Sequence, residues 1–409
     1  MTRQTHFCPV HKVGAGDCHH FFGYYNKSNF DRSGRRLLAQ QVPMREVNLT
    51  GHELAEVGYF DLEDGDKFHV IGETSTWNWQ MGSQIQWLGG TADRQIIYNS
   101  RRATPDSSLP YPEYQSTIHD LDSGTERHLP LPIYIVAPNG KHAFCVNYSR
   151  FQITHPTICY RAHHGEPELE LAPEGDGIFR MDIQTGEYQL ILSLAELTRF
   201  QHVPSMDKAI HWVTHMEMNP SSKRLLFIHR WTERVEDETC FLHRLFTCNA
   251  DGSDLRLLEC SDHPLPQLAG GFDPNDVGTF DYEKSEYQIS HPLWKGDDHV
   301  YDDRTGDAVV VGRGELTENG HMTYFNGGNW MISDTYPDDE TNERFLFLWD
   351  AEGEARIDIG SFLTDPNLGK ENRCDLHPRW RWDGQAVCID SIHEGERQLY
   401  VVDVSRLVG

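Results

Sequence analysis

The feature that most constrains the fold of this 409-residue chain is a hairpin turn that recurs along its length. Each copy has an aromatic or apolar run, a polar turn and a second apolar run. Short turns of this kind between alternating apolar runs are a strong signal for β-hairpins. Seven segments fit the description: 23–41, 82–100, 132–148, 214–231, 290–303, 320–336 and 371–391.

A second series of turns alternates with the first. These turns contain Asp-Gly or Thr-Gly pairs, or a related Gly, and they are centred on Gly65, Gly124, Gly186, Gly252, Gly306 and Gly353. Two hairpins in each of seven units predict an all-β seven-bladed β-propeller, as one domain over 1–409. The seventh unit lacks its second hairpin, so we expect the N-terminal segment before Gly23 to close the last blade. The fifth unit is short, and its completeness stays open.

Composition restricts the binding partners. The formal net charge is -27, which disfavours nucleic acid and anionic membranes. No apolar run reaches the ~18 residues that a membrane-spanning helix needs. The nine cysteines are odd in number and scattered, without a Cys-x-x-Cys pair, which suits reduced thiols. We therefore expect a cytoplasmic protein, or a periplasmic one if a leader has been removed.

Histidines recur where the later blades begin. Inner strands of a propeller converge on its axis, so residues that open these strands can meet. His215, His291, His321 and His377 open blades four to seven, and Cys374 lies three residues before His377. Imidazoles and a thiolate suit a divalent metal, with zinc favoured over manganese. The predicted metal ligands are His291, His321, Cys374 and His377, with Asp334 and Asp375 as carboxylates that orient them. The alternative is a polar channel in which these histidines bond water or backbone.

Tyrosines and arginines form a second set of candidates. Tyr24 precedes the first turn, Tyr148 and Arg161 follow the third blade's second strand, and Arg230 ends that of the fourth. The alternative for the tyrosines is an ordinary buried ring with a satisfied hydroxyl.

The blades resemble those of the seven-bladed propeller polysaccharide lyases, the oligogalacturonate and ulvan lyases. The similar pieces cover most of the chain: "FFGYYNKSNFDRSGRRLL", "LPIYIVAPNGKHAFCVNYSRF", "GDGIFRMDIQTGE", "THMEMNPSSKRLLFIHRW", "NGHMTYFNGGNWMISDTYPD" and "RCDLHPRWRWDGQAVCIDSIHEGERQLYVVDV". The resemblance implies β-elimination at a uronic acid, with a metal near the axis. It implies His215 as the base, and Tyr148 and Arg161 as further catalytic residues.

The chain also departs from this family. Where the ulvan lyases carry catalytic histidines around the second blade, this sequence has Gln80 and Asn99. Neither side chain can act as a base, which counts against ulvan cleavage. We expect Gln80 and Asn99, with Tyr24 and Arg230, to bind an anionic uronate oligosaccharide instead.

Two other functions stay open. A closed site of His291, His321, Cys374 and His377 would make the metal structural, and the propeller a binding scaffold. A metal-assisted glycan hydrolase is the other alternative, since a zinc-bound water could serve it. An open position on the metal that faces His215 would favour the lyase.

Overall fold

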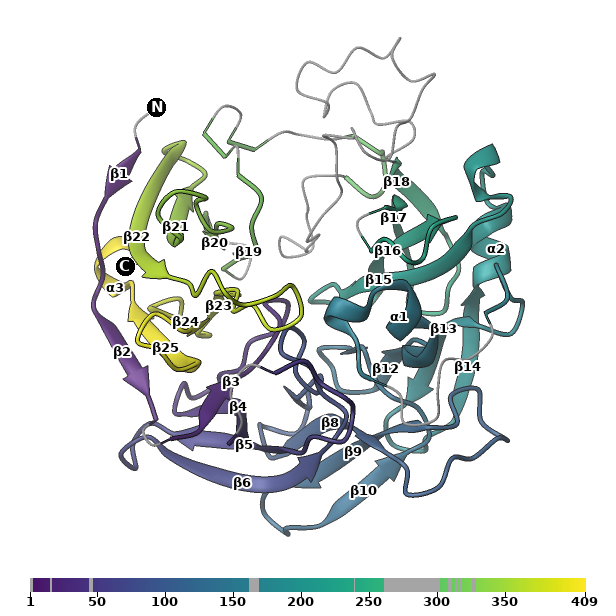
Figure 1. The fold of residues 1–409 in the computed structure, drawn as a ribbon, viewed down its shortest axis with the longest axis horizontal. Coiled ribbons are helices and arrows are strands. Elements are labelled where there is room, and N and C mark those ends of the chain that lie inside the picture. Colours follow the sequence, from purple (N-terminus) through teal and green to yellow (C-terminus); the bar gives the residue numbers. More distant parts are fainter. Residues whose placement is uncertain are drawn as a thin grey trace.

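The computed structural model describes residues 3–14, 17–43, 47–161, 169–238, 240–260, 302–307, 311–312, 315–316, 318–325 and 329–409. Its strands form separate, mainly antiparallel sheets set around a central axis, as in a β-propeller (Figure 1). In each sheet the inner strand is followed outward by the next strands in sequence, and in the last two sheets an N-terminal strand is added at the outer edge. The predicted all-β propeller class is therefore confirmed.

Six sheets are present in the described part of the chain, and five short helices accompany them. From the inner strand outward, the first sheet contains β3 (His19–Phe21), β4 (Arg36–Val42), β5 (Ala55–Asp61) and β6 (Lys67–Thr74), and the second contains β7 (Gln86–Trp87), β8 (Gln95–Arg101), β9 (Tyr114–Asp120) and β10 (Glu126–Leu129). The third sheet contains β11 (Ile135–Val136), β12 (His142–Cys145), β13 (Gly177–Asp182) and β14 (Tyr188–Ser193), and the fourth contains β15 (Ile210–Met218), β16 (Arg224–Thr232), β17 (Leu242–Asn249) and β18 (Arg256–Cys260). The fifth sheet contains β19 (Met322–Tyr324), β20 (Trp330–Asp334), β21 (Glu343–Asp350), β22 (Ala355–Leu363) and β1 (Gln4–Thr5), and the sixth contains β23 (Arg379–Trp380), β24 (Ala386–Ser391), β25 (Gln398–Asp403) and β2 (Val10–Val13). The helices are α1 (Tyr148–Thr154), η1 (Pro156–Ile158), α2 (Leu194–Arg199), η2 (Pro204–Met206) and α3 (Ser405–Val408).

The described residues thus form six blades where the sequence predicts seven. The segment expected to form the fifth blade, 290–307, is described only over 302–307. That piece is the expected turn: Gly306 N donates to Asp302 O at 2.7 Å. It packs against the preceding blade, because Asp303 forms a 2.7 Å ion pair with Arg224 at the start of β16.

The N-terminal segment closes the ring, as the sequence predicts. β2 pairs antiparallel with β25, from Val10 opposite Val402 to Val13 opposite Leu399. One strand earlier, β1 adds to the neighbouring blade in parallel with β22, so that the segment crosses two blades (Figure 1). The last blade therefore contains strands from both ends of the chain, and the ring cannot open without breaking β2 from β25.

Apolar side chains between neighbouring blades hold the ring together. Leu37 of β4, Ile96 of β8 and Leu399 of β25 are fully buried members of one cluster. The first two blades and the last one in the sequence thus share a core, and burial of each such side chain stabilises the fold by about 1.5–3 kcal/mol.

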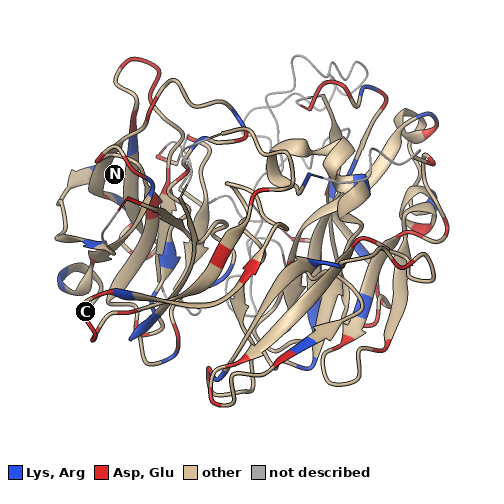
Figure 2. Ribbon diagram, turned by 60° about the horizontal axis from the view of Figure 1, so that its bottom comes forward, with Lys and Arg blue, Asp and Glu red and all other residues tan. Residues whose placement is uncertain are grey.

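Charged residues are spread over the molecule rather than confined to one blade. Acidic residues occur in many turns at both ends of the strands, with basic residues between them (Figure 2). Within the described residues, no helix is long and apolar enough to cross a membrane.

Candidate metal and active site

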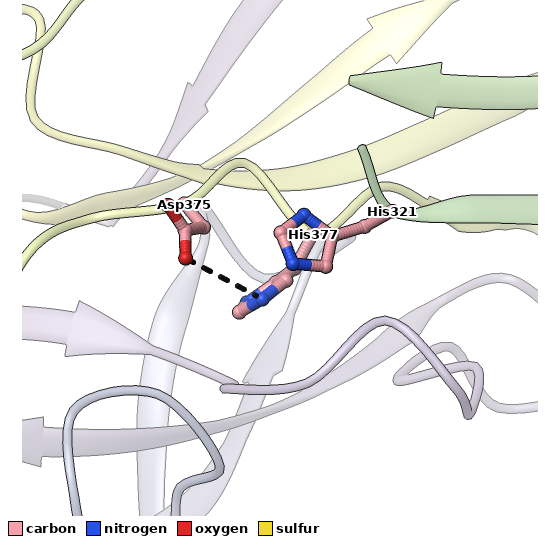
Figure 3. Close-up of side chains that lie close together, drawn as sticks. All are labelled: His321, Asp375 and His377. Atoms are coloured by element: carbon pink, nitrogen blue, oxygen red, sulfur yellow. Dashed lines mark ion pairs between the residues drawn. The ribbon is translucent and has the colours of Figure 1, made fainter. Parts of the chain in front are cut away.

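A cluster of two histidines and one carboxylate lies at the start of two neighbouring inner strands. His321 immediately precedes β19, and Asp375 and His377 lie in the extended segment before β23. Their potential ligand atoms all lie within 4.8 Å of one another, and all three residues are buried (Figure 3). Residues 377 and 321 come from different blades, so the convergence of inner strands creates the cluster, as the sequence predicts.

Asp334 at the end of β20 orients both histidines. Its Oδ1 lies 3.0 Å from His321 Nδ1 and accepts from the His321 backbone N–H at 2.6 Å. Its Oδ2 accepts from the His377 backbone N–H at 3.1 Å. Because Asp334 engages Nδ1 of His321, the other ring nitrogen, Nε2, is the one available to a metal. This is the orienting role that the sequence predicts for Asp334.

Two arginines neutralise Asp375. Arg344 Nη2 lies 2.8 Å from its Oδ1, and Arg373 Nε lies 2.7 Å from its Oδ2. Burial raises the pKa of the Asp375 carboxyl, but these guanidinium groups outweigh it and hold that pKa well below its ordinary value. The carboxylate is therefore ionised, the state in which it can bind a cation. The sequence analysis treats Asp375 as an orienting group, whereas the structure places it among the potential ligands.

The residues present fit a divalent metal. Two imidazoles and one ionised carboxylate are common ligands of zinc and manganese, and three protein ligands are typical of a site that keeps an open position. Among the described residues the cluster differs from the predicted set in two: it contains Asp375 and lacks Cys374. Cys374 is buried beside the group but is not one of its members. His291, the remaining predicted ligand, lies outside the described residues.

The alternation of an extended chain explains the position of Cys374. Side chains at successive positions of extended chain point to opposite faces, so 373 and 375 share one face while 374 and 376 share the other. Leu376 is indeed buried in the core cluster of the last blade. Burial raises the pKa of the Cys374 thiol to about 12. A protonated thiol in the blade interior is a poor metal ligand.

A tyrosine and a histidine form a close pair beside the cluster. The Tyr24 hydroxyl lies 2.6 Å from His215 Nε2. The Tyr24 ring also lies 5.0 Å from the ring of His377, measured between centroids. Complete burial raises the pKa of Tyr24 well above its ordinary value, so its hydroxyl keeps the proton and can donate a hydrogen bond to Nε2. In that arrangement Nε2 carries no proton, and Nδ1 carries the imidazole proton toward Thr214 Oγ1, 3.0 Å away.

His215 owes its position to an irregularity in β15. The pairing of β15 with β16 shifts register between Thr214 and Glu217, and His215 has a φ of 52°. His377 has a φ of 45°. Left-handed backbone is uncommon for residues other than glycine and occurs preferentially at functional sites. Two of the histidines on the axis are thus held in this conformation by the surrounding structure.

Arg230 of β16 supplies a buried positive charge on the same axis. Its Nη1 donates to His155 Nδ1 at 2.9 Å, and its guanidinium lies 4.3 Å from the centre of the Phe241 ring. Burial lowers the pKa of Arg230 to about 10, a value at which it is still charged at neutral pH. Burial also lowers the pKa of His155 well below its ordinary value, so this neutral imidazole can accept the bond. Arg230 therefore lies in position to attract an anion toward Tyr24.

Three other predicted residues serve the fold around this site. Tyr148 donates through its hydroxyl to Ile133 O at 2.9 Å and stacks on Tyr160. Asn99 donates to the same carbonyl at 2.7 Å and to the Tyr160 hydroxyl at 3.0 Å. Gln80 donates to the backbone carbonyl of Arg373 at 2.7 Å, which holds the segment that carries Asp375.

Arg161 is the last of the predicted residues. It forms an ion pair with Glu371, and about a third of each side chain is exposed. The pair links the loop after η1 to the segment before β23. The structure thus brings together His215, Tyr24, His321 and His377, with Arg230 close to Tyr24, and it does not place Tyr148, Asn99 or Cys374 in that group. It adds Arg373 and Arg344, and it moves Asp375 from an orienting role to that of a potential ligand. The alternating pattern in "RCDLH" could have indicated Arg373 and the new role of Asp375.

Comparisons with known proteins add structural likeness only. No family model matches the chain, and no curated protein matches it. An oligogalacturonate lyase from Vibrio parahaemolyticus is similar in structure, with a TM-score of 0.49 and 11% identity over 97% of this chain and 94% of that one. An oligogalacturonate lyase in complex with manganese has a TM-score of 0.46 and 13% identity over 98% and 96%. A prolyl endopeptidase has a TM-score of 0.49 and 9% identity over 95% of this chain and 48% of that one. Identities this low say nothing about activity.

Proposed function

We propose that this chain is a carbon–oxygen lyase that cleaves uronic-acid-containing oligosaccharides by β-elimination. One observation carries the proposal: an imidazole, a protonated phenol and several buried cations converge beside a potential metal site. β-Elimination next to a carboxylate needs a base for the C5 proton, an acid for the leaving oxygen and positive charge for the carboxylate. Each requirement has a matching residue on the propeller axis.

His215 is the proposed base. Its Nε2 has no proton when it accepts the Tyr24 hydrogen bond, so a substrate that displaces this contact meets an acceptor nitrogen. Thr214 holds the opposite ring nitrogen at 3.0 Å, which keeps the tautomer in place when Nε2 takes the C5 proton. The imidazolium so formed is stabilised by its hydrogen bonds.

Tyr24 is the proposed acid, in place of the predicted Tyr148. Its hydroxyl faces the axis, whereas that of Tyr148 is engaged by Ile133 O. A phenol of raised pKa keeps its proton until a strongly basic alkoxide develops at the leaving oxygen, and this is when the proton is needed. The tyrosinate that remains can recover a proton from the imidazolium at 2.6 Å, which restores both groups.

Cations are proposed to bind the carboxylate of the substrate. Arg230 and Arg373 both act electrostatically on the Tyr24 hydroxyl, so both lie near the reacting atoms. A divalent metal at His321, Asp375 and His377 would neutralise the uronate carboxylate as charge builds up on it. Without the thiolate of Cys374 the donor set has only nitrogen and oxygen, so zinc loses its advantage and manganese fits equally well.

The test is an absorbance assay for an unsaturated uronate product. Purified protein would be offered oligogalacturonates and other uronate oligosaccharides, with and without a chelator. We expect absorbance to rise, and to be lost with chelator and in His215→Ala. Reducing ends that appear without absorbance would indicate a hydrolase. Tight metal binding with no product from any substrate would indicate a binding scaffold, and either result would overturn the proposal.

A further inference from the structure

A pocket lies farther along the inner strands that carry Tyr24, His215, His321 and His377. In each of four blades, residues that line this pocket follow a residue on the propeller axis by one to three positions. Tyr25 to Lys27 follow Tyr24, Glu217 follows His215, Thr323 follows His321, and Arg379 follows His377. Because a strand rises about 3.3 Å per residue, these lining residues are displaced along the axis from the residues they follow. The volume of the pocket is about 400 Å³. We call it the mouth pocket and define it by Lys27, Arg32, Phe325, Arg379, Trp380 and Trp382.

The charge of the mouth pocket is opposite to that of the protein. Four basic residues line it, Lys27, Arg32, Arg379 and Arg381, with one acidic residue, Glu217. The whole chain has 63 acidic and only 36 basic residues. A concentration of positive charge on an acidic protein attracts anions to that point.

Two of these cations form no close ion pair with a carboxylate of the described residues. Arg379 pairs with Asp390 at 2.6 Å, and Arg381 pairs with Asp383 at 2.8 Å. Within the described part of the chain no ion pair joins Lys27 Nζ or the Arg32 guanidinium to a carboxylate, but Glu217 acts electrostatically on Lys27. The exposed Arg32 therefore supplies positive charge without a paired carboxylate, and Lys27 supplies a second positive charge that Glu217 partly offsets.

Lys27 has room for one more acceptor. Its ammonium donates to Asn26 Oδ1 at 2.9 Å and to Gln84 Oε1 at 2.7 Å, and a lysine has three N–H donors. Burial lowers the pKa of Lys27 to about 8, and it raises that of Glu217. An anion bound here would favour the charged lysine, while a protonated Glu217 would not repel it.

Aromatic rings make the remaining walls. Trp382 is 46% exposed, yet its ring is held by a 3.0 Å bond from Nε1 to Phe30 O, and the Arg32 guanidinium lies 4.9 Å from its centre. The rings of Phe325 and Trp380 lie 5.5 Å apart. A fixed and exposed indole beside an unneutralised cation forms a surface for a flat or ring-shaped anion.

We propose that the mouth pocket is a second binding site, and that it takes a small carboxylate that carries a ring. The ring lies against Trp382, and the carboxylate binds Lys27 and Arg32. A volume of about 400 Å³ lies within the ~300–1,000 Å³ of typical small-molecule sites. Sugar acids and aromatic acids share this chemistry. The site stands independently of the proposed lyase reaction, because it uses none of the residues assigned to acid, base or metal.

The experiment is a titration of the full chain in which binding is measured by tryptophan fluorescence and by calorimetry. The probes are sodium galacturonate and sodium benzoate, with galactose and benzyl alcohol as uncharged counterparts. We expect saturable binding of at least one acid and at least tenfold weaker binding of its uncharged counterpart. Binding of galacturonate alone would identify a sugar-acid site, and binding of benzoate alone an aromatic-acid site.

Variants assign the binding to the pocket. Trp382→Ala and Arg32→Gln change exposed side chains, and each should weaken binding of the acid by about tenfold. Lys27→Met should abolish it. Tyr188→Ala and Lys67→Met, on the outer strands β14 and β6, are matched controls that should bind as the unmodified chain does. The proposal is overturned if neither acid binds, if the uncharged compounds bind equally well, or if Trp382→Ala and Arg32→Gln bind unchanged.

Discussion

The hydroxyl of Tyr24 lies 2.6 Å from Nε2 of His215, although 191 residues separate the two in the sequence. Tyr24 follows the first inner strand, and His215 lies at the irregularity in β15. The ring of blades brings both to the axis, beside His377. Residues of three blades thus form one acid–base arrangement.

Removal of either partner should reduce lyase activity strongly. For Tyr24→Phe and for His215→Gln we expect kcat/KM on an oligogalacturonate to fall by about 10²–10⁴-fold, the range for loss of a general acid or base. The double variant should be little worse than the worse single one, because the two act as a unit. Initial rates of absorbance increase measure this. Tyr188→Phe, on an outer strand, is the control. Activity kept in Tyr24→Phe would exclude Tyr24 as the acid.

Metal binding should depend on Asp375 and not on its neighbour Cys374. We expect the purified chain to contain about one divalent ion, and His321→Ala, His377→Ala and Asp375→Asn to lose it. Cys374→Ala should keep it, because the thiol is not among the clustered ligand atoms. Elemental analysis gives the metal content, and the melting temperature with and without chelator gives a second measure. Loss of metal in Cys374→Ala alone would support the zinc site that the sequence predicts.

The sequence predicts those parts of this structure that depend on local patterns. Asp-Gly turns and alternating apolar runs predict the hairpins, and the missing last hairpin predicts that the N-terminal segment pairs with β25. His321 and His377 meet because inner strands converge. The choice between Cys374 and Asp375 depends instead on which face of one short segment points to the axis. Likewise, Tyr148 and Asn99 have suitable chemistry, but their partners, Ile133 and Tyr160, become apparent only in three dimensions. The count of seven blades is not reproduced, since the described residues form six.

Acid should destabilise the protein through buried histidines in the fourth sheet. His211 Nδ1 lies 2.9 Å from His229 Nε2, with the two rings stacked. Burial lowers the pKa of His211 to about 4, and it lowers that of His229 as well. The unfolded chain takes up these protons below its ordinary pKa of 6.5, whereas the folded chain does not. Stability is therefore present near pH 7 and is lost as the pH falls from about 6.5 toward 4.

Urea unfolding at pH 7 and pH 5 measures this effect. His211 alone should lower the free energy of unfolding by about 2 kcal/mol between these values. His211→Gln should reduce the difference between the two pH values, whatever its effect at pH 7. His6→Gln, which changes an exposed histidine, should leave the difference unchanged. An unchanged difference in His211→Gln would show that His211 is not held neutral by the fold.

Closure of the ring should depend on the buried face of β2. Val13 is fully buried and shares a core cluster with Leu399, whereas Val10, three residues earlier in the same strand, is 43% exposed. Val13→Asp would bury a carboxylate among apolar side chains, so we expect a loss of at least ~3 kcal/mol or complete unfolding. Val10→Asp should cost about 1 kcal/mol or less. Val13→Ala gives a graded version if Val13→Asp does not fold. Chemical unfolding followed by circular dichroism measures each change. Because β2 joins both ends of the chain in one blade, the stability lost at Val13 should lower the denaturant midpoint of a single unfolding transition of the whole ring. Equal effects at Val10 and Val13 would mean that β2 is not docked as the structure shows.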